Sequence, residues 1–317
     1  METLIDLVLL GFLLILAFIA WSIIILAVIQ LIISIISFIL SPMTKKNRVG
    51  VINIHGTITS LNESKRPSPG VTYEAINKLI DRAVTSGVIG MIFDIDSPGG
   101  QVAASFKIAK RITDLKLPTI AVIKDSGASG GYLIASACNK IIADEWSSVG
   151  SIGVILPLVE GEELFKKIGI GYYPDLKVGK YKDLGLPYKR LKDEEIGILK
   201  RDLDETYDSF IEFVAKQRNM DKEVLAQLAT GETYLGRTAQ RNGLVDVIGD
   251  RITAKEEMKK LTGKPKIREV HFTAKPRRVS LFQGLIDDFI FKSGKTFAQG
   301  FRETIKDELN TKEKIEL

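Results

Sequence analysis

The first forty residues most constrain what this chain can fold into. From Leu4 to Leu40 the sequence is an almost unbroken run of Leu, Ile, Val, Phe and Ala. About twenty apolar residues suffice to cross a bilayer, and the run is too long for the apolar core of a secretory signal. We therefore expect residues 1–43 to be a transmembrane anchor and the rest of the chain to be a globular part of ordinary charge.

The anchor permits two topologies. It is long enough for one tilted helix or for a hairpin of two short helices, and the lack of a Pro or Gly pair midway favours one span. Acidic Glu2 and Asp6 precede the span, whereas Lys45, Lys46 and Arg48 follow it. The positive-inside rule then predicts a cytoplasmic globular part after a single span, while a hairpin keeps both ends on one side.

Composition limits the classes of function. The 317 residues include 44 Lys+Arg and 39 Asp+Glu, for a formal net charge of +5. The basic residues are scattered, which gives nucleic-acid binding little support and favours contact with an anionic membrane surface. The single cysteine, Cys138, excludes an internal disulfide framework, and we interpret it as core packing. The sequence has neither a P-loop nor a Cys/His cluster, so no metal or organic cofactor is expected.

After Pro42 the chain alternates between strand and helix patterns. Short apolar runs predict strands at 49–54, 89–95, 119–123, 140–143 and 151–156. Helical periodicity predicts helices at 73–86, 101–115, 131–138, 161–168, 193–218, 221–229 and 238–242. Alternating elements of these lengths predict an α/β fold, with a parallel sheet and helices on both of its faces.

The segment 264–317 differs from the rest in being basic, with apolar residues at helical spacing between Leu281 and Ile305. We expect an amphipathic tail that docks on a neighbouring element, with membrane-surface contact as the alternative. The globular domain is thus expected to cover residues 47–263.

A glycine-rich turn carries the candidate nucleophile. Ser129 lies in GASGGY (127–132), between an apolar strand and a helix of small residues. At such a passage the free N–H groups of the first helical turn can stabilise a developing oxyanion. Turns of this kind also bind phosphate or simply pack tightly, so the turn by itself leaves these alternatives open beside catalysis.

A second glycine turn supports the catalytic interpretation. The stretch DIDSPGG (94–100) ends another apolar strand, and parallel strands end at the same edge of a sheet. The oxyanion hole would then combine the N–H of Gly130 with that of Gly99 or Gly100. An extended substrate would add as a strand to the nearby segment 149–154. The residues expected to bind it are Gly150, Ser151, Ile152 and Gly153.

Six short blocks follow one another in a recognisable order. They are NIHGTI (53–58), DSPGG (96–100), ASGGY (128–132), VGSIGV (149–154), GKYKD (179–183) and GLVD (243–246). Together they resemble peptidase family S49, the signal peptide peptidase A family, over about residues 49–250. The resemblance implies the Clp protease/crotonase-like fold and one catalytic unit per chain. It also implies a serine peptidase for signal peptides or other unfolded segments, with its catalytic domain outside the cytoplasm.

A serine nucleophile needs a base, and few groups qualify. Of the two histidines, His55 ends the first strand and His271 lies in a late segment expected to be peripheral. A lysine serves when burial or cationic surroundings lower its pKa, but lysine is too abundant here for composition to select one. The resemblance selects Lys182 in GKYKD, with Lys180 second and Lys177 third.

The resemblance further implies a dyad shared between subunits. Family members with one catalytic unit per chain form rings in which this lysine reaches the serine of the adjacent subunit. Lys182 is therefore expected to serve Ser129 of a neighbour, and a monomer to be inactive. Two rivals stay open: a crotonase-like acyl-CoA enzyme, disfavoured by the anchor and the GKYKD block, and a non-catalytic membrane scaffold, disfavoured by the intact pair.

Overall fold

The protein is described by a computed structural model that covers residues 11, 14, 18–35, 47–60 and 70–273. Phe18–Ile35 form a helix with a mean hydropathy of 2.7, long and apolar enough to cross a membrane. This helix agrees with the expected anchor, whereas the number of spans depends on residues outside the described part. The predicted loop at 60–70 and the amphipathic tail also lie largely or wholly outside it.

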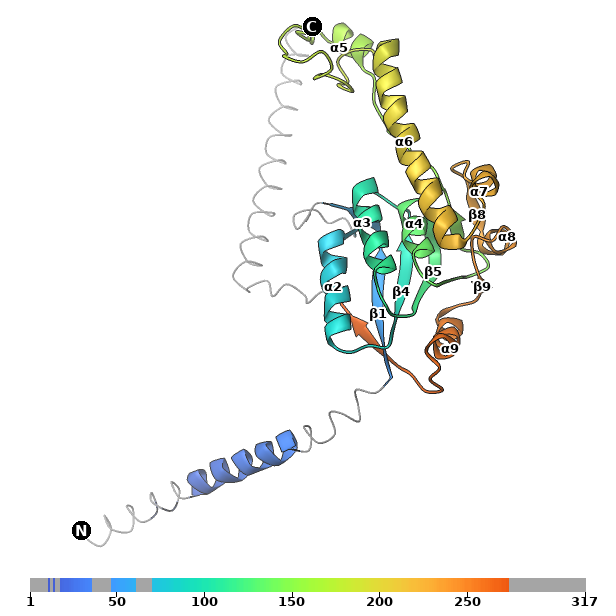
Figure 1. Cartoon of the computed structure of the whole chain (residues 1–317). Coiled ribbons are helices and arrows are strands. Elements are labelled where there is room, and N and C mark those ends of the chain that lie inside the picture. The colour runs from blue at the N-terminus through green and yellow to red at the C-terminus, as the bar shows by residue number, and fades with distance from the viewer. Residues whose placement is uncertain (1–10, 12–13, 15–17, 36–46, 61–69, 274–317) are drawn as a thin grey trace, which may run out of the picture. The chain divides into compact units, whose positions relative to one another are not determined.

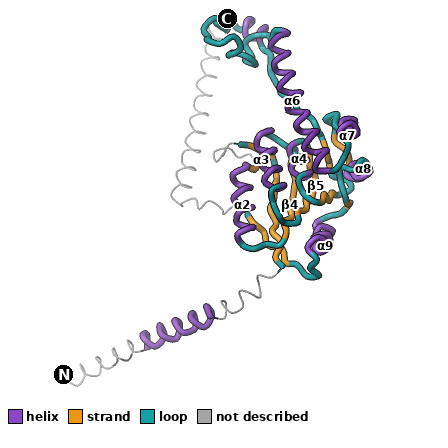
Figure 2. Tube along the Cα trace, viewed as in Figure 1, coloured by secondary structure: helices purple, strands orange, loops and turns teal. Residues whose placement is uncertain are grey.

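An eight-stranded sheet forms the frame of the globular part (Figures 1 and 2). Its main path runs β10-β1-β4-β5-β6-β9, and every pair along this path is parallel. These strands are β1 (Arg48–His55), β4 (Gly90–Ser97), β5 (Thr119–Ala128), β6 (Lys140–Ala143), β9 (Val247–Ile248) and β10 (Arg268–Phe272). The predicted α/β fold with a parallel sheet is therefore confirmed.

Two smaller pairings lie at the carboxyl ends of the central strands. β7 (Ser148–Gly150) pairs with the end of β5 and, antiparallel, with β8 (Thr233–Leu235). β2 (Thr57–Thr59) and β3 (Gly70–Thr72) form a separate parallel pair, and Ile58 bridges to Gly100. These short pairings gather several loops at one edge of the sheet.

Helices cover both faces of the sheet. The larger core lies under α2 (Tyr73–Thr85), α3 (Val102–Thr113), α4 (Gly130–Ser136) and the C-terminal half of α6 (Asp193–Arg218). The smaller core lies under α9 (Arg251–Thr262). Along β4, Phe93 points into the larger core and Ile92 into the smaller one, the alternation of a strand buried on both faces. The other described helices are α5 (Glu162–Lys167), α7 (Lys222–Leu228) and α8 (Gly236–Arg241).

Two predictions need correction. The strand expected at 151–156 does not form, because φ is +104° at Gly150 and +48° at Ser151, which ends β7 and turns the chain. The domain does not end at Gly263 either, since β10 pairs with β1 and buries Phe272 against the sheet. His271 thus lies in an edge strand of the main sheet, and the compact unit continues to Thr273.

Candidate active site

Ser129 occupies a strained turn between β5 and α4. Its backbone has φ 51° and ψ −122°, a conformation that costs a non-glycine residue about 1–3 kcal/mol and persists only where the surroundings impose it. The surroundings here are specific: the Ser129 N–H donates to the Gly150 carbonyl at 2.8 Å, and its carbonyl accepts from the Leu133 N–H at 2.9 Å. Such a sharp strand-to-helix turn presents a serine side chain at the sheet edge.

The two predicted glycine turns lie against each other. A Cβ added to Gly99 would lie 2.8 Å from both the Gly130 nitrogen and the Ser129 Cβ. A Cβ on Gly130 would lie 2.2 Å from the Ser105 Oγ, so only glycine fits there without a shift of its neighbours. The contact follows from β4 and β5 being adjacent parallel strands that end at one edge.

The backbone donors beside Ser129 are not equivalent. The Gly99 N–H donates to the Ser97 Oγ at 3.1 Å and is therefore occupied. Within the part of the chain that the structure describes, the N–H groups of Gly100 and Gly130 have no acceptor. These two residues and Ser129 line one small recess. Of the two alternatives that the sequence left open, Gly100 is thus the free donor.

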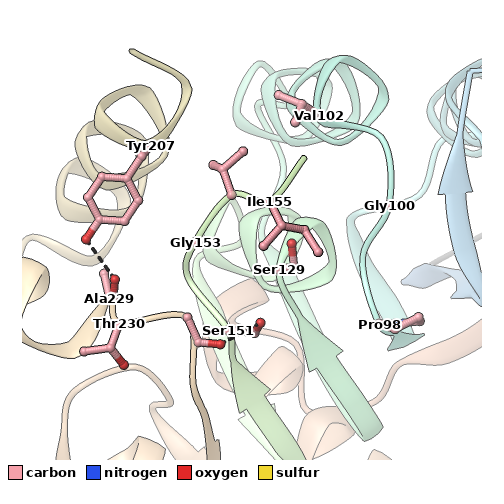
Figure 3. A pocket seen from close by; sticks show the side chains of 12 residues that line it. Pro98, Gly100, Val102, Ser129, Ser151, Gly153, Ile155, Tyr207, Ala229 and Thr230 are labelled. Carbon is pink, nitrogen blue, oxygen red and sulfur yellow. Dashed lines mark hydrogen bonds between the residues drawn. The ribbon is translucent and has the colours of Figure 1, made fainter. Parts of the chain in front are cut away.

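A cavity of about 520 Å³ opens in front of Ser129 (Figure 3). Ser151, Gly153, Ile155 and Tyr207 line it together with Thr230 and other residues. The recess beneath it is largely apolar, with walls from Val102, Phe106, Leu133, Val154 and Phe210. No charged side chain among the described residues lines either space, and the Ser129 Oγ makes no hydrogen bond to any of them.

The four residues predicted to bind substrate separate into two roles. Ser151 and Gly153 line the cavity. Gly150 instead holds the Ser129 backbone through its carbonyl, and Ile152 is buried in the core with its carbonyl accepting from the Gly231 N–H at 3.1 Å. From 153 to 160 the described chain makes no backbone hydrogen bond of its own, so a peptide strand can pair there.

Lys182 lies apart from Ser129 in the same chain. It belongs to an exposed segment, residues 155–196, which we call the lysine arm. The neighbouring Lys180 contacts Glu194 at 2.8 Å, near the start of α6. Tyr207, which lines the Ser129 cavity, follows about 13 residues later on the same helix, a distance of about 20 Å. A lysine side chain does not bridge that separation.

Comparison with known proteins decides the family. The model of peptidase family S49 matches residues 111–264. A protein from Synechocystis sp., named as a candidate protease, is 34% identical over 194 residues, which is 61% of this chain and 70% of that relative. This chain belongs to peptidase family S49. That membership agrees with the resemblance of the six sequence blocks and argues against the acyl-CoA alternative.

Further S49 relatives are matched over shorter shares of their length. A candidate protease from Methanocaldococcus jannaschii is 37% identical over 59% of each chain, and a candidate signal peptide peptidase SppA from Enterococcus faecium is 37% identical over 55% of this chain and 52% of its own. The chain thus spans between half and three fifths of these two relatives. A solved mutant of the 1510-N membrane-bound stomatin-specific protease, with a substrate peptide, aligns with 18% identity and a TM-score of 0.47, over 76% of this chain and 99% of its own.

The other candidate bases of this S49 chain are engaged elsewhere. The His55 Nε2 lies 3.6 Å from the Asp94 Oδ1 and does not line the cavity. Lys177 is paired with Asp183 at 2.5 Å. The hydrogen bond to Glu194 raises the pKa of Lys180 above its usual range, which opposes a role as base. Lys182 is exposed and has no ion-pair partner among the described residues.

Sequence patterns missed the wall opposite Ser129. Tyr207 comes from the long helix α6, and Thr230 precedes β8, whose antiparallel pairing with β7 brings it to the cavity. A pattern of neighbouring residues does not predict that side chains so far apart in the sequence line one cavity. Cys138 is buried as expected, and burial raises the pKa of its thiol to about 12, so it is not a second nucleophile.

Proposed function

We propose that this chain is a membrane-anchored serine endopeptidase that uses Ser129 as nucleophile and Lys182 as general base. The observation that carries the proposal is the turn at Ser129: a strained serine, a hydroxyl without a partner, and two free backbone donors at Gly100 and Gly130 around one recess. Nucleophile elbows of this kind serve acyl transfer. Membership of a peptidase family supports the peptide bond as the target.

The reaction proceeds through an acyl-enzyme. The Ser129 oxygen attacks the peptide carbonyl while a neutral Lys182 amine takes its proton, and the resulting ammonium donates a proton to the leaving amine. The N–H groups of Gly100 and Gly130 stabilise the oxyanion of each tetrahedral intermediate. The neutral lysine then deprotonates a water, which attacks the ester, and the ammonium returns that proton to the departing Ser129 oxygen. These steps require no metal or organic cofactor.

The pair is shared between subunits in this proposal. The described cavity contains no cation, and Lys182 projects from an arm whose apolar side chains are largely exposed. Val178, Leu176 and Val159 are 96%, 83% and 77% exposed, an unusual surface for a separate monomer. A homo-oligomeric ring would cover these residues and bring Lys182 of one subunit to Ser129 of the next.

The proposed substrates are extended, unfolded peptides with a small or medium apolar residue before the cleaved bond. The unpaired backbone at 153–160 supports strand addition, and the apolar recess under Ser129 supports the side-chain preference. Peptides of this kind include signal peptides released in a membrane. The apolar helix Phe18–Ile35 supports action near the bilayer, and we place the domain outside the cytoplasm by family resemblance although the flanking charges favour the opposite.

The test uses the full chain in detergent with an apolar reporter peptide. We expect Ser129→Ala and Lys182→Ala to be inactive singly, while Lys180→Ala, the control for a neighbouring lysine, stays active. Random 1:1 mixing of the two inactive variants should restore about a quarter of wild-type activity, because a ring site needs an intact serine and an intact lysine from adjacent subunits. If Lys182→Ala is active, Lys182 is not the general base. If mixing restores no activity, the site is not shared between adjacent subunits.

A further inference from the structure

The most buried groups of the lysine arm are charged, although Phe165, Tyr172 and Tyr188 also make ring contacts within it. All residues from 155 to 196 are described, and the two that are buried are both carboxylates, Asp183 and Glu195, each 3% exposed. Its large apolar side chains are mostly at the surface. Buried carboxylates are costly unless they are paired, so their partners determine how the arm is held.

Those partners form a continuous line of ions. The Asp183 carboxylate contacts the Lys177 Nζ at 2.5 Å and the Lys189 Nζ at 3.2 Å, and it accepts a hydrogen bond from the Tyr172 hydroxyl at 3.2 Å. Lys189 in turn contacts Glu195 at 2.5 Å. Glu195 also accepts the Lys192 N–H at 3.0 Å, which caps the start of α6. The line therefore ties a loop and a turn to the end of a long helix.

The Asp183 carboxyl is ionised at neutral pH. The ammonium groups of Lys177 and Lys189, both ion-paired with Asp183, hold the pKa of this carboxyl well below its usual range, so the carboxylate stays ionised at neutral pH. Its two cationic partners are themselves partly buried, with the Lys189 side chain 18% exposed. Removing the carboxylate would leave both ammonium groups without their shared partner.

Lys182 is the residue next to this buried carboxylate. Its N–H donates to the Gly179 carbonyl at 3.1 Å, and the Leu184 N–H donates to the Tyr181 carbonyl at 3.1 Å, so a tight turn carries it. With Asp183 pointing inward, Lys182 is left at the surface of the turn, free of ion pairs among the described residues. No apolar residue of the arm is fully buried, and the ring nearest to Asp183 is that of Tyr172, which stacks on Tyr188 with ring centroids 5.8 Å apart.

We propose that Asp183 is a positioning residue, whose buried carboxylate fixes the turn that presents Lys182 to the Ser129 of a neighbouring subunit. The inference rests on the proposed function, since it takes Lys182 to be the base. Asp183 itself touches neither substrate nor reacting atoms. It acts through the geometry of the turn and through the negative charge that it places beside the lysine.

Two measurable effects follow from Asp183→Asn. A loosened turn should lower kcat about 10- to 100-fold with KM little changed, because a small displacement of a catalytic group costs rate rather than binding. The loss of one negative charge also favours the neutral form of the Lys182 amine, so the rise of activity with pH should move to lower pH. The charged or titratable groups around this turn are Tyr172, Lys177, Lys180, Tyr181, Lys189, Lys192, Glu194 and Glu195.

The experiment compares pH–rate profiles of four full-chain variants in detergent, with ring assembly checked by size exclusion. Asp183→Asn should show the fall in kcat and the shift, and Asp183→Glu should restore the profile because it keeps the charge. Glu195→Gln is the matched control, since it removes the other buried carboxylate of the line without touching the residue beside Lys182. It should leave the midpoint of the profile in place. Lys182→Ala completes the set.

The outcomes separate this inference from the function on which it rests. If Lys182→Ala is active, the proposed base is wrong and the inference fails with it. If Lys182→Ala is inactive but Asp183→Asn matches wild type in kcat and profile, the positioning role alone is overturned. If Asp183→Asn and Glu195→Gln both lose the ring, or both lower kcat with unmoved profiles, Asp183 is a structural residue only. A shift confined to Asp183→Asn, reversed by Asp183→Glu, supports the role.

Discussion

The edge that carries Ser129 and the arm that carries Lys182 are built on opposite principles. At the serine edge, two glycine turns pack backbone against backbone, and the large core beneath fixes the strained turn. In the arm the buried groups are two carboxylates, and apolar side chains lie at the surface. The fold of one chain thus brings together the proposed nucleophile and the proposed oxyanion donors. The proposed base belongs to a segment that one chain leaves exposed.

The largest expected effect comes from the serine edge. A Cβ on Gly100, where φ is +154°, would lie 2.0 Å from the Ile58 carbonyl oxygen, so Gly100→Ala must displace the turn and its free N–H. We expect kcat to fall by a factor on the order of 10²–10³, the typical effect of losing one oxyanion donor. Gly87→Ala is the control, because Gly87 also has a positive φ, +74°, but open space around it.

Peptidase assays and thermal unfolding of both variants distinguish the causes. Gly87→Ala should lose about 1 kcal/mol of stability through backbone strain and keep its activity. Equal activity losses in the two variants would mean that strain, not the Gly100 donor, limits the reaction.

The second prediction tests whether the exposed apolar side chains of the lysine arm form the interface between subunits. Leu176→Glu places a charge on an apolar side chain that is 83% exposed and lies outside the proposed substrate-pairing segment 153–160, so the folded subunit should keep its melting temperature. We expect loss of the ring and at least a 10-fold loss of activity, because a charge disrupts an apolar interface. Analytical ultracentrifugation and peptidase assays measure both. Ile252→Glu on α9, at a site 72% exposed, is the control and should stay assembled and active.

The same contrast explains what the sequence could and could not predict. The strand at Lys140–Ala143 and the helix at Asp193–Arg218 have the predicted bounds, since each rests on a strong local pattern. β10 was missed because an edge strand with one buried residue, Phe272, looks polar and basic in sequence. The helix α9 was missed although its signals were present: Asp250 accepts the N–H groups of Ile252 and Thr253 as an N-cap, and Gly263 ends the helix.

Site residues follow the same division. The turns at Ser129 and Gly100 could be predicted because glycine patterns at strand ends are local, and parallel strands bring those ends together. Tyr207 could not, because its place in the cavity depends on how α6 packs on α4. Nor could residue types alone select Lys182, which needed the family block. Its distance from Ser129 in one chain is a property of the tertiary structure.

The third prediction, with a smaller expected effect, concerns substrate preference at the recess under Ser129. Phe106 lines the recess under Ser129 and packs edge-on against Phe213, with ring centroids 6.0 Å apart. Phe106→Ala enlarges the recess, so kcat/KM for a bulky residue before the cleaved bond should rise about 10-fold relative to alanine at that position. Phe106→Leu keeps more of the volume and should change the ratio less. An unchanged ratio in a library of paired peptides would mean that the side chain binds elsewhere.

The last prediction uses acid to separate the two regions. The ion pair of Lys177 with Asp183 and the hydrogen bond from Lys189 to Glu195 lower the pKa of both carboxyls in the folded state. A group with a lowered folded pKa contributes its full stability above its unfolded pKa, about 4 here, and loses it progressively as the pH falls from there towards the folded value. The two most buried groups of the arm are these carboxylates, whereas the larger core that includes Phe93 and Ile95 is made of apolar side chains. Hydrogen exchange, expressed as protection relative to the intrinsic amide rate at each pH, should therefore show weaker protection of 155–196 near pH 3 than at pH 7, while β4 and β5 keep theirs. Equal loss of protection in both regions would mean that the arm is held by something other than its ions.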